Sequence, residues 1–246
     1  MCTQCDDPSA DRSSSLTRRK LLKLASGAAL GFGLLGRSRA AEVVAPPKPH
    51  NVLTPNEAVD RLMKGNNRYV KGNMKQHDFL AERPALAIGQ NPFAAILGCA
   101  DSRVAPEYAF DCGRGDVFVC RVAGNFADVN SVASLEYAVA VLGTPLILVL
   151  GHEMCGAVKS AMKAVTHGEE FPGHIPSLIK AIRPAVKAAQ DQPGDLLDNA
   201  IKQNVVLNVG KLKTAGPILS KAVQDGKLKV LGGVYSLETG RVTLIS

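Results

Sequence analysis

The chain has 246 residues, 46% of them hydrophobic and 21% charged, which suits a globular protein with one sizeable domain and an appendage. The net charge is +7, but residues 1–41 contribute +4 of it, with seven Lys or Arg against three Asp or Glu. The sequence has no Trp and no basic stripe interleaved with aromatic residues. These features argue against nucleic acid as a partner.

The N-terminal residues have the features of an export signal. Arg18 and Arg19 precede an uncharged run, residues 24–36, which is too short to span a bilayer but typical of a signal-peptide core. The paired arginines and the Gly- and Ala-rich run resemble a twin-arginine signal, and small residues just before position 41 provide a cleavage site. We expect residues 1–41 to be removed and the protein to reach the bacterial periplasm or the thylakoid lumen without stable membrane insertion. An uncleaved membrane anchor is the alternative.

The remaining sequence, from residue 42, begins with a linker and then a helix. Residues 42–51 contain three prolines and predict the linker. Thr54, Pro55 and Glu57 have the spacing of a helix N-cap with a capping box, and the helix should end near Gly72. We expect this helix to form an N-terminal arm whose apolar face packs on a partner subunit. The folded domain is predicted to cover residues 52–246.

The rest of the domain alternates strands and helices. Apolar runs predict strands at 93–98, 116–122 and 145–151, and helical spacing predicts helices at 131–142, 156–165, 176–190 and 195–213. The last of these ranges includes a strand-like run, but the longer window follows helical spacing. Residues 227–235 and 240–245 predict a C-terminal β-hairpin. We therefore expect an α/β fold with a mostly parallel central β-sheet flanked by helices, and ligands beyond the carboxyl ends of its strands.

Two predicted strands end in metal-binding side chains. Cys99 follows the first strand, and His152 and Cys155 follow the third. Two Cys and one His are ligands that zinc prefers, and a tetrahedral ion needs a fourth. Asp101 could be that fourth ligand or could accept a proton from a water bound there. A bidentate pair with Arg103 would hold Asp101 off the metal. A closed zinc site that only braces the fold is the alternative.

The other cysteines give weaker signals. Cys2 and Cys5 form a C-x-x-C pair in a polar stretch with no strand before it, which is a poor context for a redox pair. Cys112 and Cys120 lie in or beside apolar sequence, where a free cysteine usually behaves as a small core residue.

Three motifs occur in one order and separation: Cys99-Ala-Asp-Ser-Arg103, Arg121-x-Ala-Gly-Asn125 and Gly151-His-x-x-Cys-Gly-Ala157. Together they resemble the β-class carbonic anhydrases, over roughly residues 52–246. The resemblance implies one Zn²⁺ per chain on Cys99, His152 and Cys155, and reversible hydration of carbon dioxide to bicarbonate and a proton by zinc-bound hydroxide. It implies that Asp101 accepts a hydrogen bond from the hydroxide. If Arg103 releases it, Asp101 can instead bind zinc and close the site.

The resemblance also implies a substrate cleft. Gln90 would donate a hydrogen bond to a substrate oxygen, and Phe118, Ala123 and Gly156 would line the cleft. Tyr137 matches a residue that is contributed across a subunit interface, so we expect a homodimer or homotetramer. Core packing is the alternative for Phe118 and Tyr137. The absence of Trp favours an open site with water on zinc.

Two other functions remain compatible with the sequence. The same scaffold could split carbonyl sulfide or carbon disulfide, or a zinc-braced protein could bind a partner without turnover. His167 and His174 flank a polar loop and could relay protons, although solvated loop histidines are the simpler interpretation.

Overall fold

The computed structural model describes residues 48–245. The predicted signal, its cleavage site and residues 42–47 of the predicted linker lie outside the described residues. Within the described range no helix combines the length and the apolar character needed to cross a membrane.

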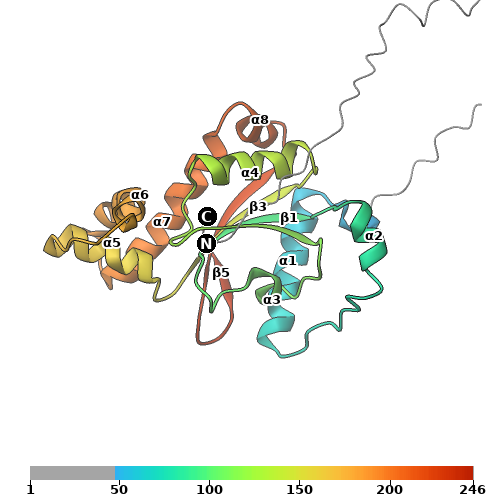
Figure 1. Cartoon of the computed structure of the whole chain (residues 1–246), viewed down its shortest axis with the longest axis horizontal. Helices are drawn as coiled ribbons and strands as arrows, with labels where there is room; N and C mark the ends of the chain where they lie inside the picture. Colours follow the sequence, from blue (N-terminus) through green and yellow to red (C-terminus); the bar gives the residue numbers. More distant parts are fainter. Residues whose placement is uncertain (1–47, 246) are drawn as a thin grey trace, which may run out of the picture. The chain divides into compact units, whose positions relative to one another are not determined.

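A five-stranded sheet forms the centre of the domain (Figure 1). Its strands are β1 (Ala94–Gly98), β2 (Val117–Arg121), β3 (Leu146–His152), β4 (Lys229–Tyr235) and β5 (Val242–Leu244). Their order is β2-β1-β3-β4-β5, with the first four parallel and β5 antiparallel to β4. Every residue of β1 and β3 is buried, which explains their continuous apolar composition. The mostly parallel sheet and the C-terminal hairpin confirm the predicted fold.

Helices cover both faces of this sheet. They are α1 (Pro55–Val70), α2 (Arg83–Ile88), α3 (Pro106–Ala109), α4 (Val129–Ala140), α5 (Gly156–His167), α6 (Ile175–Ala189), α7 (Leu196–Thr214) and α8 (Ile218–Gln224). Ile96 of β1 packs in a core with residues of α1 and α3, whereas Leu97 packs with residues of α4, α7 and α8. Adjacent strand residues point to opposite faces, so β1 separates these two cores. A third core joins α5, α6 and the first half of α7 (Figure 1).

Helix α1 begins as the sequence predicts. The Thr54 side chain accepts a hydrogen bond from the Glu57 backbone N–H at 3.3 Å, and the Glu57 carboxylate accepts one from the Thr54 N–H at 2.8 Å. The expected packing of its apolar face on a partner is wrong. Ala58 and Leu62 are buried in this chain's own core, against residues such as Phe93, because that face meets the sheet directly.

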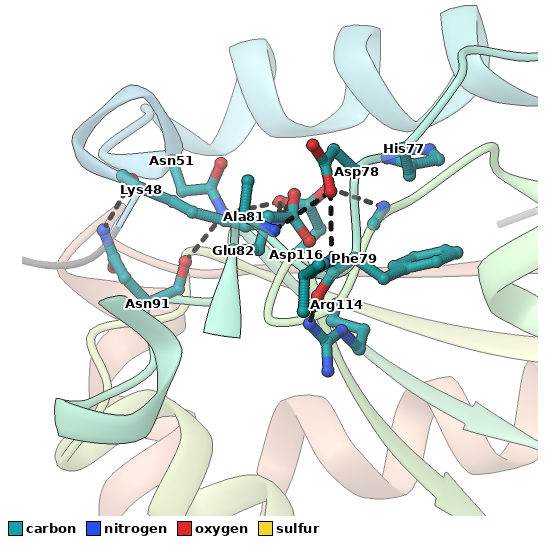
Figure 2. Close-up of polar contacts among 12 residues, drawn as sticks. Lys48, Asn51, His77, Asp78, Phe79, Ala81, Glu82, Asn91, Arg114 and Asp116 are labelled. Carbon is teal, nitrogen blue, oxygen red and sulfur yellow. Dashed lines mark hydrogen bonds and ion pairs between the residues drawn. The ribbon is translucent and has the colours of Figure 1, made fainter. Parts of the chain in front are cut away.

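The last residues of the predicted linker are also folded, contrary to the prediction. Residues 49–51 form a short 3-10 helix, and Asn51 is buried. Its side-chain amide donates to the Asn91 carbonyl at 2.8 Å and to Asp116 at 3.0 Å. Lys48 forms ion pairs with Asp116 at 3.1 Å and Glu82 at 3.3 Å (Figure 2). Residues 48–51 therefore belong to the folded domain. Proline is tolerated in the first turn of a helix, and the polar contacts of Lys48 and Asn51 hold this short helix in place.

Three short helices, α2, α3 and α8, were not predicted. They have four to seven residues, too few to show a helical repeat of apolar side chains. The ambiguous range near residue 205 is helical throughout, as the longer window predicts.

Candidate metal centre

Cys99, His152 and Cys155 come together at the carboxyl edge of the sheet. Because β1 and β3 are parallel neighbours, with Gly98 paired to Leu150, the residues that end them emerge side by side. Cys155 is the N-cap residue of α5 and follows a turn in which Met154 has φ 53°. One ligand atom from each of the three lies within 4.8 Å of the others, and all three side chains are buried. Residues far apart in the sequence thus place three metal-ligand atoms close together.

One ring nitrogen of His152, Nε2, is free to bind a metal. His152 Nδ1 lies 2.8 Å from the Glu153 carbonyl, and a carbonyl only accepts, so Nδ1 carries the proton. Nε2 is buried and has no hydrogen-bond partner. A buried polar atom without a partner costs free energy that a metal bond would remove. The Glu153 backbone is held next to β4, since its N–H donates to Tyr235 O at 3.0 Å. The tautomer and the carbonyl partner are those of a metal-binding imidazole.

The two sulfurs lie 4.0 Å apart. The hydrogen bond from the Cys155 thiol lowers the pKa of Cys99 against the effect of burial, and the hydrogen bond from the Gly124 N–H acts in the same direction. The bond between the two sulfurs raises the pKa of Cys155, and burial raises it further. A thiolate is the metal-binding form of cysteine. Two sulfurs and an imidazole nitrogen in one buried cluster fit Zn²⁺ by number and chemical type.

Asp101 is held by Arg103. The guanidinium donates from Nε to Oδ1 at 2.9 Å and from Nη2 to Oδ2 at 2.8 Å, and the Arg103 backbone N–H donates to Oδ1 at 2.9 Å. These bonds hold the pKa of Asp101 well below its usual range. Oδ2 also lies 3.9 Å from His152 Nε2, which places the carboxylate beside the three-residue cluster. Of the two arrangements that the sequence leaves open, the structure has the pair with Arg103.

Comparisons with known proteins agree with this geometry. A model of the family described as "Carbonic anhydrase" matches residues 94–242. Carbonic anhydrase 2 of Mycobacterium tuberculosis is 40% identical over 185 residues, which cover 74% of this chain and 89% of that protein. A solved structure of the β-carbonic anhydrase CcaA has a TM-score of 0.58 and 29% identity, over 76% of this chain and 95% of that one. The Coccomyxa β-carbonic anhydrase bound to acetazolamide has the same TM-score and identity, over 77% and 82%.

This chain belongs to the β-class carbonic anhydrase family. It contains the Cys-His-Cys group that suits zinc in this family. Three of the four metal-binding residues inferred from the sequence form that group, and the fourth, Asp101, lies beside it in a pair with Arg103.

Arg121 is a residue of this carbonic anhydrase to which the sequence assigned no role. Its Nε donates to the Cys99 carbonyl at 2.9 Å, and its Nη2 donates to the carbonyls of Asp101 at 2.6 Å and Val104 at 2.9 Å. It thus fixes the backbone that carries Cys99 and the Asp101–Arg103 pair. Its place at the end of β2 and within a motif was visible, but the three carbonyl partners depend on how the loops fold.

The structure divides the predicted cleft residues into two groups. Ala123 adjoins Gly124, whose N–H donates to Cys99 Sγ at 3.3 Å, and Gly156 follows Cys155 as the first residue of α5. Gly156 is thus adjacent in the chain to a metal-binding residue, and Ala123 is adjacent to a residue that hydrogen-bonds one.

The other three cleft residues are not brought to the metal centre within one chain. Phe118 pairs with Ala95 in the first half of β1, and its ring packs on that of Tyr137 with centroids 6.4 Å apart. Gln90 follows α2, at the end of β1 opposite Cys99, and lines a surface cavity with Arg114.

The two loop histidines are exposed. His167 ends α5, where its Nδ1 contacts the Thr166 hydroxyl, and His174 precedes α6. Their exposure agrees with the simpler interpretation of solvated side chains.

Proposed function

We propose that this protein catalyses the reversible hydration of carbon dioxide to bicarbonate and a proton as a zinc enzyme. The observation that carries the proposal is the buried Cys99–His152–Cys155 cluster beside a carboxylate that Arg103 holds. Zn²⁺ would be held by the two sulfurs and His152 Nε2. With three protein ligands and an open fourth position, zinc lowers the pKa of a bound water toward 7.

The protein's own groups have separate tasks in this reaction. Asp101 stays ionised because Arg103 neutralises it, so its carboxylate acts as a fixed acceptor that orients the attacking water. Arg121 keeps the loop carrying that carboxylate in place. The neighbouring core includes Phe126, Val158 and Ile182, and this apolar packing keeps bulk water from the ligands.

The direct test is Cys99→Ala. Removal of one of three ligands should abolish stoichiometric zinc binding and reduce carbon dioxide hydration to background. Stopped-flow hydration assays together with metal analysis measure both. Cys112→Ala is the matched control, because burial raises the pKa of that thiol to about 12. The thiol donates to the Phe110 carbonyl at 3.4 Å and packs against the core beside α1 and α3. Zinc-loaded wild-type protein without hydration activity would contradict the proposal.

We further propose that the active enzyme is a homodimer or homotetramer in which Gln90 and Tyr137 of one copy complete the cleft of another. Gln90 and Phe118 are remote from Cys99 within one chain, and Tyr137 is 47% exposed. Val141, the C-cap residue of α4 and one turn after Tyr137, is 63% exposed, and Val129 at the start of α4 is 79% exposed. Exposed apolar side chains of this kind suit contact with a second copy. A monomer by light scattering with full activity would contradict this.

We also propose that residues 1–41 direct export by the twin-arginine pathway, with the periplasm as the destination. The support is the paired Arg18 and Arg19 before an uncharged run. Unaltered export after both arginines are changed to Lys would contradict it.

A further inference from the structure

The loop between β2 and α4, residues 122–127, touches the metal centre through its backbone. The Gly124 N–H donates to Cys99 Sγ at 3.3 Å. Gly124 has φ +87° and Asn125 has φ 42°, so two successive residues occupy the left-handed region. A Cβ on Gly124 would lie 2.4 Å from Ile182 Cδ1. This conformation is unfavourable for most residues and has to be held by its surroundings.

A polar stripe on α7 holds the loop. Asn204 Nδ2 donates to the Gly124 carbonyl at 2.7 Å, and Asn208 Oδ1 accepts from the Ala127 N–H at 2.8 Å. Lys211 Nζ donates to the Ala127 carbonyl. The three side chains lie at i, i+4 and i+7, on one face of the helix. They therefore hold the loop at Gly124, within its strained part, and at Ala127, two residues after Asn125.

The two amides are buried and joined to each other. Asn204 is 2% and Asn208 is 7% exposed, and Asn208 Nδ2 donates to the Asn204 carbonyl at 2.7 Å and to its Oδ1 at 3.2 Å. The other buried residues of α7 are apolar: Leu197, Ala200, Ile201, Val205, Val209 and Leu212. A buried amide is favourable only where it is hydrogen-bonded. These two amides form their hydrogen bonds with the loop and with each other.

We propose that Asn204 and Asn208 are positioning residues of the metal centre, which hold the Gly124 N–H on the Cys99 sulfur. Asn204 anchors the carbonyl of the same residue whose N–H contacts the sulfur, so it restricts the backbone rotation of Gly124 and helps to position that N–H. A hydrogen bond to a ligating sulfur withdraws charge from it and so tunes the metal. The inference rests on the proposed function, because it concerns the same zinc site.

The test measures metal binding rather than turnover. Metal-free protein is titrated with Zn²⁺ against a chromophoric chelator, and with Co²⁺ alone to read the thiolate-to-metal charge-transfer band. Asn204→Ala should weaken Zn²⁺ binding by about 10–100-fold, as loss of an outer-shell partner typically does, and should shift the band. Asn208→Ala should change the Zn²⁺ affinity and the band in the same direction but by less, because Asn208 contacts the loop at Ala127. Asn204→Ser keeps a hydroxyl donor and should be intermediate.

Two control variants separate positioning from stability. Asn66 is also a buried amide, and it bonds the carbonyls of Ala109 and Gly240 and the Val242 N–H, at 2.8, 2.8 and 2.9 Å. Asn66→Ala should lower the Tm but leave the Zn²⁺ affinity and the band unchanged. Asn199 lies on α7 itself and donates to the Pro193 carbonyl at 3.0 Å, so Asn199→Ala should leave both unchanged.

Two results would overturn the proposal. Folded Asn204→Ala and Asn208→Ala proteins with wild-type Zn²⁺ affinity and an unshifted band would overturn it, and so would equal changes in Asn66→Ala. If Asn204→Ala does not fold, Asn204→Ser and Asn208→Ala provide the same readings. Wild-type protein that binds zinc without hydrating carbon dioxide would contradict the proposed function, while the metal measurements would still judge the positioning role.

Discussion

Arg103 connects the local sequence to the state of the metal centre. It lies two residues after Asp101 and reaches it with two guanidinium nitrogens and its own N–H. The planar guanidinium matches a carboxylate in a way that an ammonium cannot. The carboxylate is therefore both ionised and held in one orientation beside His152.

Arg103→Ala should lower kcat for hydration by about 10–100-fold while zinc content and fold are retained. Without the guanidinium, the pKa of Asp101 rises toward its ordinary value, and the carboxylate is free to turn toward the metal. Arg103→Lys should recover little activity, because a point charge does not reproduce the bidentate contact. Stopped-flow kinetics and metal analysis measure these effects.

Arg183→Ala is the control for this pair, since Arg183 is an exposed arginine on α6. Full activity in Arg103→Ala would contradict the role of Arg103 in holding Asp101.

Among the elements, α1 shows most directly how local sequence starts a structure. Thr54 and Glu57 satisfy two backbone N–H groups at the helix start, with Pro55 in the first turn. The helix then buries Ala58 and Leu62 on its own sheet. Its start is thus set by residues within one turn, and its packing is set by the sheet.

Thr54→Ala should lower the free energy of unfolding by about 1 kcal/mol, because it removes the capping bond. For a domain of this size the Tm should fall by about 2–4 °C. Thermal unfolding followed by circular dichroism measures the shift. Thr166→Ala is the control, since that hydroxyl bonds the Met162 carbonyl within α5 and caps no helix start. Equal shifts in both variants would show that the capping box contributes nothing specific.

At the scale of the whole molecule, Asp116 joins the N-terminal residues to the sheet. It precedes β2 and interacts with Lys48, Asn51 and Arg61 from the start of the folded domain. Burial alone would raise the pKa of Asp116, but the hydrogen bonds from Asn51 and Lys48 outweigh burial and lower it. A lowered folded-state pKa means that ionised Asp116 contributes stability that is fully present above its unfolded pKa, about 4. That stability is lost as the pH falls through the folded-state pKa.

Asp116→Asn should therefore lower the free energy of unfolding at pH 7 by about 1–3 kcal/mol, since it leaves buried partners poorly satisfied. Its stability should also fall less than that of the wild type as the pH drops from 5 to about 3. Urea unfolding at a series of pH values measures both effects. Asp60→Asn, an exposed carboxylate on α1, should change neither. A parallel acid dependence in Asp116→Asn and wild type would exclude Asp116 as the titrating group.

Short-range features of this protein were readable in the sequence. The helix start at Thr54, the buried strands, the hairpin and the ligands at Cys99, His152 and Cys155 each follow from residues near one another or from apolar runs. Parallel strands bring their carboxyl ends to one edge, so two strands ending in ligands predicted one site. The Asp101–Arg103 pair was predicted as an option because only one residue separates its members.

Long-range features came only from the tertiary structure. The side-chain amides of Asn204 and Asn208 hydrogen-bond a loop about 80 residues earlier in the chain. Arg121 donates to three carbonyls of another loop, and Asn51 is buried and donates to the carbonyl of Asn91. Each of these side chains is an ordinary polar residue by sequence, and its partner is a backbone group that every residue carries. A backbone partner leaves no mark on the sequence of either segment. Only folding, which places a particular N–H or carbonyl within hydrogen-bonding distance, gives these residues their roles.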